Sequence, residues 1–253
     1  MLFAVDIGNT NIVIAIHDGN DWVENWRIHS DAKKTTDEYY VLLESLSKHG
    51  KAKKYNIDRA VISSVVPNLT RAIEKNIKRL FDISPIMINQ ECITGLIPSS
   101  IPQQIGNDLL CNLAQAHNLH PLKNVMVVDF GTALTMSCVN NNGEVLGVSI
   151  APGLITAVNS LFGNTAQLPQ VELKKPKHVM GRTTDQSIRS GIMNGYAGLV
   201  ESMILRTEAE YGIELHVIAT GGLSNTICKE INRIDEVDMF HTLNGMKLIA
   251  SLN

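Results

Sequence analysis

Two stretches of the chain repeat one pattern of apolar and polar positions. In the first, the apolar run Leu2–Val5 ends at Asp6, and the polar turn Gly8-Asn9-Thr10 separates it from a second apolar run, Ile12–Ile16. This pattern predicts a strand, a tight turn and a second strand. A carboxylate at the end of a buried strand, beside a glycine that lets a ligand approach the backbone, suits a site for a metal ion and a phosphate group.

The second copy of the pattern lies in the other half of the chain, at Val127-Val128-Asp129-Phe130-Gly131-Thr132-Ala133. A single Asp-x-Gly sequence is more often a plain β-turn. Two copies, each at the end of an apolar strand, favour a phosphate-binding site instead. In that interpretation the turn amides and the side chains of Asn9, Thr10 and Thr132 hold phosphate oxygens, while the two carboxylates hold a cation.

The remaining periodicity predicts helices between further strands, the mixture that is typical of an α/β layer structure. Thr35-x-x-Glu38 is a candidate capping box for a helix that we expect to end at Gly50 and a lysine-rich loop. Residues 91–105 contain two prolines and a serine pair, which predict irregular structure. Further strands are expected at residues 21–29, 57–66, 83–88, 126–128, 134–139, 145–150 and 217–219, and further helices after residues 67, 108, 153, 183 and 223.

The repeated pattern also predicts how the chain divides into domains. Each half opens with a set of three strands that contains the aspartate turn, and helices and strands follow it. We therefore expect two pseudo-symmetric α/β lobes, residues 1–115 and 116–253, with their aspartate turns facing one cleft.

Composition and charge narrow the class of protein. The 253 residues are 44% hydrophobic and 19% charged, with a formal net charge of −3, which disfavours a nucleic-acid-binding protein. No uncharged apolar run approaches the length of a membrane span, and the N-terminus lacks a basic region. Four widely spaced cysteines without a Cys-x-x-Cys pair favour a reducing compartment. We expect a cytoplasmic protein that binds neither nucleic acid nor membranes.

The familiar nucleotide-binding and metal-binding sequences are missing. There is no Gly-x4-Gly-Lys-[Ser/Thr] loop and no Gly-x-Gly-x-x-Gly sequence, and the eight histidines show no spacing typical of metal ligands. Asp108, two residues after Gly106, has two interpretations. It is either an acid that the helix dipole stabilises at a helix N-terminus, or a base for a substrate hydroxyl. Its spacing alone favours the first interpretation. The pair Gly221-Gly222 after a strand either admits a flat base or simply caps a turn.

Taken in order, these motifs resemble the type III pantothenate kinases, the family that includes the Bvg accessory factors, in the acetate-kinase/sugar-kinase/Hsp70/actin superfamily. The resemblance runs along nearly the whole chain and implies two ribonuclease-H-like (actin-like ATPase) lobes. The blocks that carry it are Asp6–Asn11, Trp26-Arg27, Thr36–Tyr39, Ser63–Pro67, Thr94–Leu96, Gly106–Asp108, Asp129–Ala133, Ile150–Leu154, Thr165–Pro169, Ser190-Gly191 with Gly195, and Ala219–Leu223.

The resemblance implies ATP-dependent phosphorylation of pantothenate to 4'-phosphopantothenate, the first step of coenzyme A biosynthesis. It implies that Asp6 meets the ATP phosphates and Mg²⁺, and that Asp129 helps to hold a monovalent cation, K⁺ or NH₄⁺. Electrostatic stabilisation of this kind suits a transferring phosphoryl group, on which negative charge accumulates. The other residues that it places beside the nucleotide are Gly8, Asn9, Thr10, Gly131, Thr132, Gly221 and Gly222.

On the acceptor side, the resemblance makes Asp108 the base toward the pantothenate hydroxyl. It also implies that Gly106 and Asn107 contact the substrate, and that Thr184 lies near pantothenate across a homodimer interface.

The chain departs from the family pattern around the acceptor. The family block usually reads Gly-x-Asp-Arg, but here Leu109 follows Asp108. The preceding loop, Pro98-Ser99-Ser100, lacks the usual tyrosine, and Gly147-Val148 stands where the family has Gly-Gly. An arginine that clamps a carboxylate is not replaced by leucine. The alternatives are therefore a degenerate member with an accessory or regulatory role, or a kinase with another acceptor.

Overall fold

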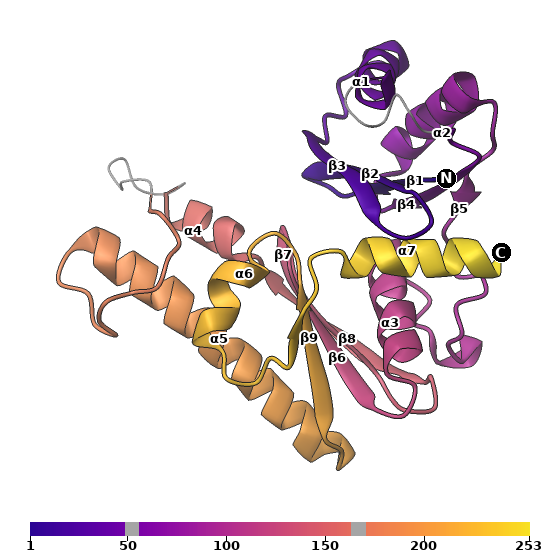
Figure 1. Ribbon diagram of the computed structural model, residues 1–253. Coiled ribbons are helices and arrows are strands. Elements are labelled where there is room, and N and C mark those ends of the chain that lie inside the picture. Colours follow the sequence, from indigo (N-terminus) through magenta and orange to yellow (C-terminus); the bar gives the residue numbers. More distant parts are fainter. Residues whose placement is uncertain (49–55, 163–170) are drawn as a thin grey trace. The chain divides into compact units, whose positions relative to one another are not determined.

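The computed structural model describes residues 1–48, 56–162 and 171–253 (Figure 1). The chain forms two compact units, each described by itself: Met1–Gln115 together with Thr242–Asn253, and Ala116–His241. The C-terminal segment thus belongs to the first unit, whereas the sequence analysis placed it in the second lobe. The expected helix end at Gly50, the lysine-rich loop and the Thr165–Pro169 block lie outside the described residues.

The first unit is built on a five-stranded mixed sheet with the order β3-β2-β1-β4-β5. β1 and β2 are antiparallel, whereas β1 and β4 are parallel. The strands are β1 (Leu2–Ile7), β2 (Asn11–His17), β3 (Trp22–His29), β4 (Arg59–Ser64) and β5 (Ile86–Met87).

Helices α1 (Thr36–Lys48) and α2 (Pro67–Phe81) lie side by side on one face of this sheet (Figure 1). Phe3, Val5 and Ile7 of β1 pack in the core that these helices complete. Because side chains alternate between the two faces of a strand, Asp6 lies on the opposite face. The expected capping box is confirmed at the start of α1: Glu38 Oε2 accepts from the Thr35 backbone N–H at 2.7 Å, and Thr35 Oγ1 accepts from that of Glu38 at 3.3 Å.

Two helices contact each other near the opposite face: α3 (Asn107–Leu119) and α7 (His241–Leu252). They pack closely, because a Cβ added at Gly245 of α7 would collide with the backbone of Cys111 in α3. Trp22 Nε1 of β3 also donates to Asn244 Oδ1 at 2.9 Å. These contacts fix α7 to the first unit.

The second unit repeats the arrangement. Its five-stranded sheet has the order β10-β9-β6-β7-β8, which is the order of the first sheet read from the other edge, with β6 in the place of β1. β6 and β7 are antiparallel, and β6 and β9 are parallel. The strands are β6 (Asn124–Phe130), β7 (Ala133–Val139), β8 (Val145–Pro152), β9 (Leu215–Thr220) and β10 (Glu236–Val237).

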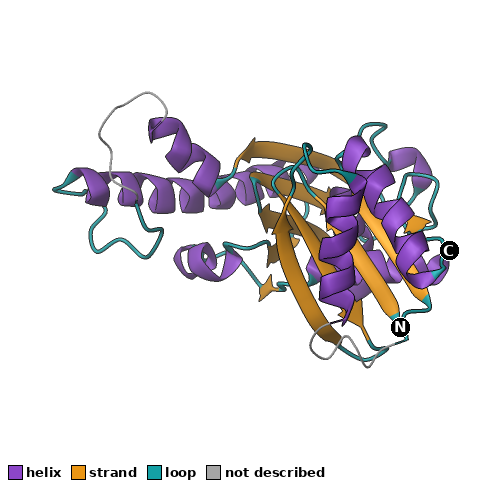
Figure 2. Cartoon of the chain, turned by 90° about the horizontal axis from the view of Figure 1, so that it is seen from above, coloured by secondary structure: helices purple, strands orange, loops and turns teal. Residues whose placement is uncertain are grey.

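The core of the second unit lies between one face of this sheet and the helices α4 (Leu154–Phe162) and α5 (Thr184–Tyr211). The long helix α5 is continuous and is also seen from above in Figure 2. Met126, Val128 and Phe130 of β6 belong to this core. Asp129 therefore lies on the other face, as Asp6 does in the first sheet.

The expected elements are present among the described residues, and the differences lie in short or late segments. The strand expected at 83–88 is reduced to two residues, and the irregular loop contains a short turn, η2 (Pro98–Ser100). The helix expected after residue 223 is the short α6 (Ser224–Ile227), followed by η3 (Cys228–Glu230). The sequence pattern does not predict β10 and α7. Within the described residues, no helix has the length and apolar character needed to cross a membrane.

Candidate active site

The carboxylate of Asp6 stands at the C-terminal end of β1, in the middle of the first sheet. In the parallel pairing of β1 with β4, Asp6 lies opposite Ser63, which is fully buried. The hydroxyl of Ser63 donates a hydrogen bond to Asp6 Oδ1 at 2.9 Å. This bond fixes the carboxylate at the edge where the ends of two parallel strands meet, the usual place for a ligand in an α/β sheet.

The turn after Asp6 is closed by backbone hydrogen bonds. The N–H of Gly8 donates to Asn11 O at 3.0 Å, and a Cβ at position 8 would come within 3.1 Å of that same oxygen. Ser30 holds the turn from the end of β3, because its N–H donates to Thr10 O at 2.9 Å and its hydroxyl to Gly8 O at 2.6 Å. Asn9 is exposed at the tip of the turn, where it can meet a ligand.

The Gly106-Asn107-Asp108 segment reaches the same end of the first sheet. Asn107 Nδ2 donates to Ser64 O, at the end of β4, over 3.0 Å. Asp108 Oδ1 accepts from the backbone N–H of Leu109 at 2.9 Å. A Cβ at position 106 would lie 2.5 Å from Asp108 Oδ1, so only glycine leaves the carboxylate its position.

The buried thiol of Cys111, one turn along α3, lies near both carboxylates. Burial raises the pKa of the Cys111 thiol well above its usual range; the nearby charges of Asp6 and Asp108 raise it further, and a hydrogen bond with Ser63 opposes them. The structure therefore brings Asp6 and Asp108 to one place in the first unit. Burial also raises the pKa of Asp108, although the hydrogen bond from Leu109 opposes that shift.

Leu109 is an apolar core residue, only 6% exposed. It stands where the family pattern has arginine, and its side chain packs inside the protein. No ammonium or guanidinium group forms an ion pair with Asp108 in the described part of the chain. Burial of this carboxylate is therefore not offset by a neighbouring cation.

The aspartate turn of the second unit contacts the glycine turn after β9. Asp129 pairs in register with Thr220, a buried hydroxyl residue in the position that Ser63 has in the first sheet. Gly221 has φ +91°, and a Cβ there would collide with Asp129 Oδ1 and the Phe130 backbone. Only glycine fits this close approach. Gly222, next in the chain, is exposed.

The carbonyl of Thr132 anchors the following turn to the start of α4. It accepts from the N–H of Gly153 at 3.1 Å and from Thr156 Oγ1 at 2.8 Å. A Cβ at Gly153 would collide with the carbonyl oxygens of Gly131 and Thr132. The backbone of the turn is thus fixed by the start of α4, while the Thr132 side chain is exposed.

Thr184 is exposed and is the first residue of α5, in the second unit. The residue before it, Thr183, caps the helix, and its side chain accepts from the Gln186 N–H at 3.3 Å. Thr184 therefore has its hydroxyl at a helix N-terminus, where backbone N–H groups favour an anionic ligand.

The structure brings the predicted residues together in two groups, one in each unit. Asp6 and its turn lie with Gly106, Asn107 and Asp108, whereas Asp129 and its turn lie with Gly221. The residues that hold these groups in place received no role from the sequence, although three of them stand in the blocks that carry the resemblance, because their contacts come from strand pairing and helix packing. These residues are Ser30, Ser63, Cys111, Gly153, Thr156 and Thr220.

Solved structures share this fold over nearly the whole chain. A Baf family protein from Campylobacter jejuni has a TM-score of 0.61 at 18% identity, with 98% of this chain and 97% of that chain covered. Component A of (R)-2-hydroxyglutaryl-CoA dehydratase from Acidaminococcus fermentans has a TM-score of 0.54 at 13% identity, with 99% and 96% covered. An Arthrobacter glucomannokinase has a TM-score of 0.50 at 15% identity, with the same coverage. The fold is that of the actin-like ATPases and sugar kinases.

Sequence comparison identifies the family. Type III pantothenate kinases from Myxococcus xanthus and Geotalea daltonii are 38% and 39% identical to this chain, with 100% of this chain and 99% of each relative covered. The enzyme of the same name from Pelobacter propionicus is 40% identical, with both chains fully covered. The family model for type III pantothenate kinase matches residues 2–206. The chain therefore belongs to the type III pantothenate kinase family.

Proposed function

We propose that this protein transfers the γ-phosphoryl group of ATP to the hydroxyl of pantothenate. Family membership supports the reaction, and one structural observation carries the assignment to residues. Asp6 and Asp108 both lie near the Cys111 thiol, so a phosphate-type turn and a candidate base occupy one end of the same sheet. Phosphoryl transfer needs little more than positioning and charge neutralisation.

Asp108 has the position and environment of the base. Burial raises the pKa of its carboxyl group, and a base with a raised pKa accepts a proton from an attacking hydroxyl more readily. The hydrogen bond from Leu109 N–H holds Oδ1 in place, and the absence of a Cβ at Gly106 leaves room for it. In the proposal Oδ2 faces the pantothenate hydroxyl, and Gly106, Asn107 and Thr184 contact the substrate.

The two aspartate turns offer oxygen donors that fit the cations of a kinase. Asp6 combines a carboxylate with the exposed side chain of Asn9, and Mg²⁺ prefers one or two carboxylates with phosphates and water. Asp129 Oδ1 lies so close to Gly221 that a Cβ there would collide with it, so the backbone of the glycine turn stands directly beside this carboxylate. We assign Mg²⁺, together with the ATP phosphates, to the Asp6 turn, and a monovalent cation, K⁺ or NH₄⁺, to Asp129. These cations neutralise charge on the transferring phosphoryl group.

In this proposal the remaining turn residues bind the nucleotide. Gly8 and Thr10 belong with the phosphates at the first turn, and Gly131 and Thr132 at the second. Gly221 and Gly222 lie beside the nucleotide. Because Leu109 is a core residue, a residue other than the one at position 109 binds the carboxylate of pantothenate.

A homodimer is supported by apolar side chains exposed in the second unit. β8 is an edge strand, and its Ile150 is 67% exposed. The segment before α5 is held against that helix by a hydrogen bond from Ser190 Oγ to Val179 O, yet Val179 and Met180 are 75% and 81% exposed. We assign these exposed apolar side chains, together with Ile155 and Leu161 of α4, to contacts with a second copy of the chain.

The cytoplasm is the compartment in which we place this reaction. All four cysteines are free, and two of them, Cys111 and Cys138, are buried. Unpaired thiols suit a reducing environment.

The direct test is a phosphorylation assay with purified protein, ATP, Mg²⁺ and pantothenate, with KCl and NaCl compared at equal ionic strength. We expect pantothenate-dependent formation of ADP and 4'-phosphopantothenate, faster in KCl. Loss of turnover in Asp108→Asn with ATP binding retained would support the role of the base.

Two other outcomes would contradict the proposal. ATP binding without turnover would favour an accessory or regulatory protein. Turnover with other hydroxyl acceptors but not with pantothenate would favour a kinase of another specificity.

A further inference from the structure

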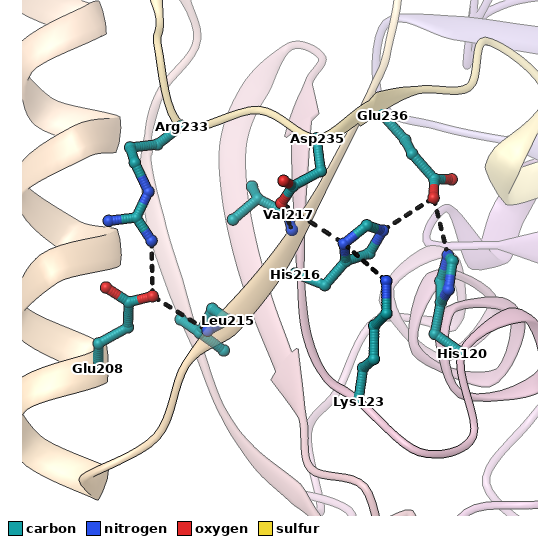
Figure 3. A network of polar contacts seen from close by, with 9 residues as sticks. All are labelled: His120, Lys123, Glu208, Leu215, His216, Val217, Arg233, Asp235 and Glu236. Carbon is teal, nitrogen blue, oxygen red and sulfur yellow. Dashed lines mark hydrogen bonds and ion pairs between the residues drawn. The ribbon is translucent and has the colours of Figure 1, made fainter.

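Three side chains that sequence analysis left without a role converge in the second unit (Figure 3). They are His120, just after α3, His216 on β9, and Glu236 on β10. Glu236 Oε1 lies 2.8 Å from His216 Nε2 and 3.1 Å from His120 Nε2. The three ligand atoms lie within 4.8 Å of one another. Three separate elements thus direct two imidazoles and one carboxylate to a single point.

The chemistry of this group is that of a metal site. Two imidazole nitrogens with one carboxylate oxygen is a ligand set that Zn²⁺ takes at open, three-ligand sites. Metal–ligand bonds of about 2.0 Å in tetrahedral geometry place ligand atoms about 3.3 Å apart. The two distances to Glu236 are slightly shorter than this, so a small outward movement of its flexible side chain would admit an ion.

The three side chains differ in burial, and the group is accessible to solvent from one side. The side chains of His120 and His216 are 18% and 13% exposed, whereas that of Glu236 is 43% exposed. His120 Nε2 is buried and has no hydrogen bond of good geometry. This nitrogen faces Glu236 Oε1 at 3.1 Å, so it points into the group, and an ion can enter from the side of Glu236.

A second carboxylate stands behind His216. Asp235 Oδ2 lies 3.5 Å from His216 Nδ1 and is held there by the Val217 N–H, which donates to it at 2.7 Å. A metal-bound histidine usually directs its other ring N–H to a carboxylate of this kind. Lys123 Nζ competes for that nitrogen, at 3.3 Å from His216 Nδ1.

We propose that His120, His216 and Glu236 form a binding site for one zinc-like divalent transition-metal ion, with Asp235 as the supporting carboxylate. In the metal-bound form His120 and His216 would each offer an unprotonated Nε2 to the ion, and any proton displaced from these nitrogens would pass to solvent. His216 Nδ1 would carry the ring proton toward Asp235, and Lys123 would withdraw. The bound ion joins the two-residue edge strand β10 to β9 and to the end of α3. The site is separate from the kinase residues assigned above, and it does not depend on the proposed reaction.

The test is a titration of the full-length, chelator-treated protein with Co²⁺ and Zn²⁺, without nucleotide or Mg²⁺. Co²⁺ reports its ligands through visible absorption bands. We expect one equivalent to bind with bands typical of nitrogen and oxygen ligands and without an intense thiolate band, and Zn²⁺ to displace it. Zn²⁺ is expected to raise the thermal unfolding temperature.

Matched variants separate this site from adventitious binding. We expect His216→Gln and Glu236→Gln to weaken binding by at least about 100-fold and Asp235→Asn by about 10-fold. His178→Gln, at an exposed histidine of the same unit, is expected to bind as the unaltered protein does. Lys123→Gln is expected to bind the ion more tightly, because it removes the competing ammonium group.

Because Glu236 is partly exposed, Glu236→Gln is expected to keep the fold, which circular dichroism checks. A loss of metal binding in this variant then reports the loss of a ligand and not unfolding. Absence of saturable binding by the unaltered protein would overturn the proposal, as would binding that persists in Glu236→Gln or a thiolate band that identifies cysteine ligands.

Discussion

At the scale of single residues, the proposed base Asp108 carries an energetic cost. Its carboxyl group is largely removed from water, and no cation among the described residues pairs with it. Burial therefore raises its pKa. An acid whose pKa is raised by folding contributes most to stability below its unfolded pKa, and that contribution is lost as the pH rises through the folded pKa. Above its folded pKa, the ionised carboxylate of Asp108 therefore lowers the stability of the fold.

The first prediction follows from this conflict. Asp108→Asn is expected to lower kcat by about 10²–10⁴-fold, yet to leave the unfolding temperature at neutral pH unchanged or higher. The difference in unfolding temperature is expected to shrink as the pH is lowered, because the aspartic acid becomes neutral. Phosphorylation rates and thermal unfolding at several pH values measure both effects.

The control for this prediction is Glu91→Gln, at an exposed acid of the preceding loop. It is expected to change neither quantity. A kcat for Asp108→Asn close to that of the unaltered protein would remove Asp108 from the role of base.

A second residue-scale prediction concerns Gly221. Gly221→Ala is expected to lower the free energy of unfolding by about 1–3 kcal/mol or more. An L side chain is strained at φ +91°, and its Cβ would collide with Asp129. Urea unfolding measures the change.

Gly198→Ala is the matched control, since a Cβ at this exposed helical glycine meets no atom within 4 Å. It is expected to be neutral or to stabilise by up to about 1 kcal/mol. Equal effects of the two substitutions would contradict the close approach of Gly221 to Asp129.

At the scale of elements, α7 is the helix whose place differs from the expected domain division. Met246 and Ile249 are fully buried in the first unit, and Gly245 packs directly on the backbone of Cys111. Cys111 lies near Asp6 and Asp108. The C-terminal helix therefore supports, from behind, the helix that carries the candidate base.

The third prediction tests this support. Met246→Ala is expected to cost about 2–5 kcal/mol of unfolding free energy, because it leaves a cavity between α7 and the first sheet. Leu252→Ala, in the same helix but 42% exposed, is expected to cost no more than about 0.5 kcal/mol. Chemical denaturation of both variants measures the difference, and a Met246→Ala effect as small as that of Leu252→Ala would show that α7 contributes little to the core.

At the scale of the whole molecule, self-association is the property that the exposed apolar surface predicts. The fourth prediction is that Ile150→Asp shifts a homodimer toward monomer, because it places a carboxylate on the surface assigned to the second copy. Val41→Asp replaces an apolar residue of similar exposure, 62%, on α1 of the first unit, and is expected to keep the dimer. Sedimentation at several concentrations distinguishes the two, and a monomeric unaltered protein would contradict the assignment.

Much of the fold could be predicted because its repeated pattern is local. Strands with a period of two, the capping box at Thr35 and Glu38, and the two aspartate turns are each specified by neighbouring residues. The structure places Asp6 and Asp129 at matching positions of two sheets with the same strand order. Late elements were harder to predict, because β10 has only two residues and α7 packs on a unit formed much earlier in the chain.

The sequence by itself determined the two α/β halves, the turns that end their central strands and the family of kinases to which the chain belongs. Only the tertiary structure decided which side chains stand beside those turns. Ser63 reaches Asp6 through parallel strand pairing, and Cys111 lies near both carboxylates through helix packing. The cluster of His120, His216 and Glu236 has no recognisable spacing in the sequence. Contacts of this kind depend on strand order and packing between distant segments, and local periodicity carries no information about them.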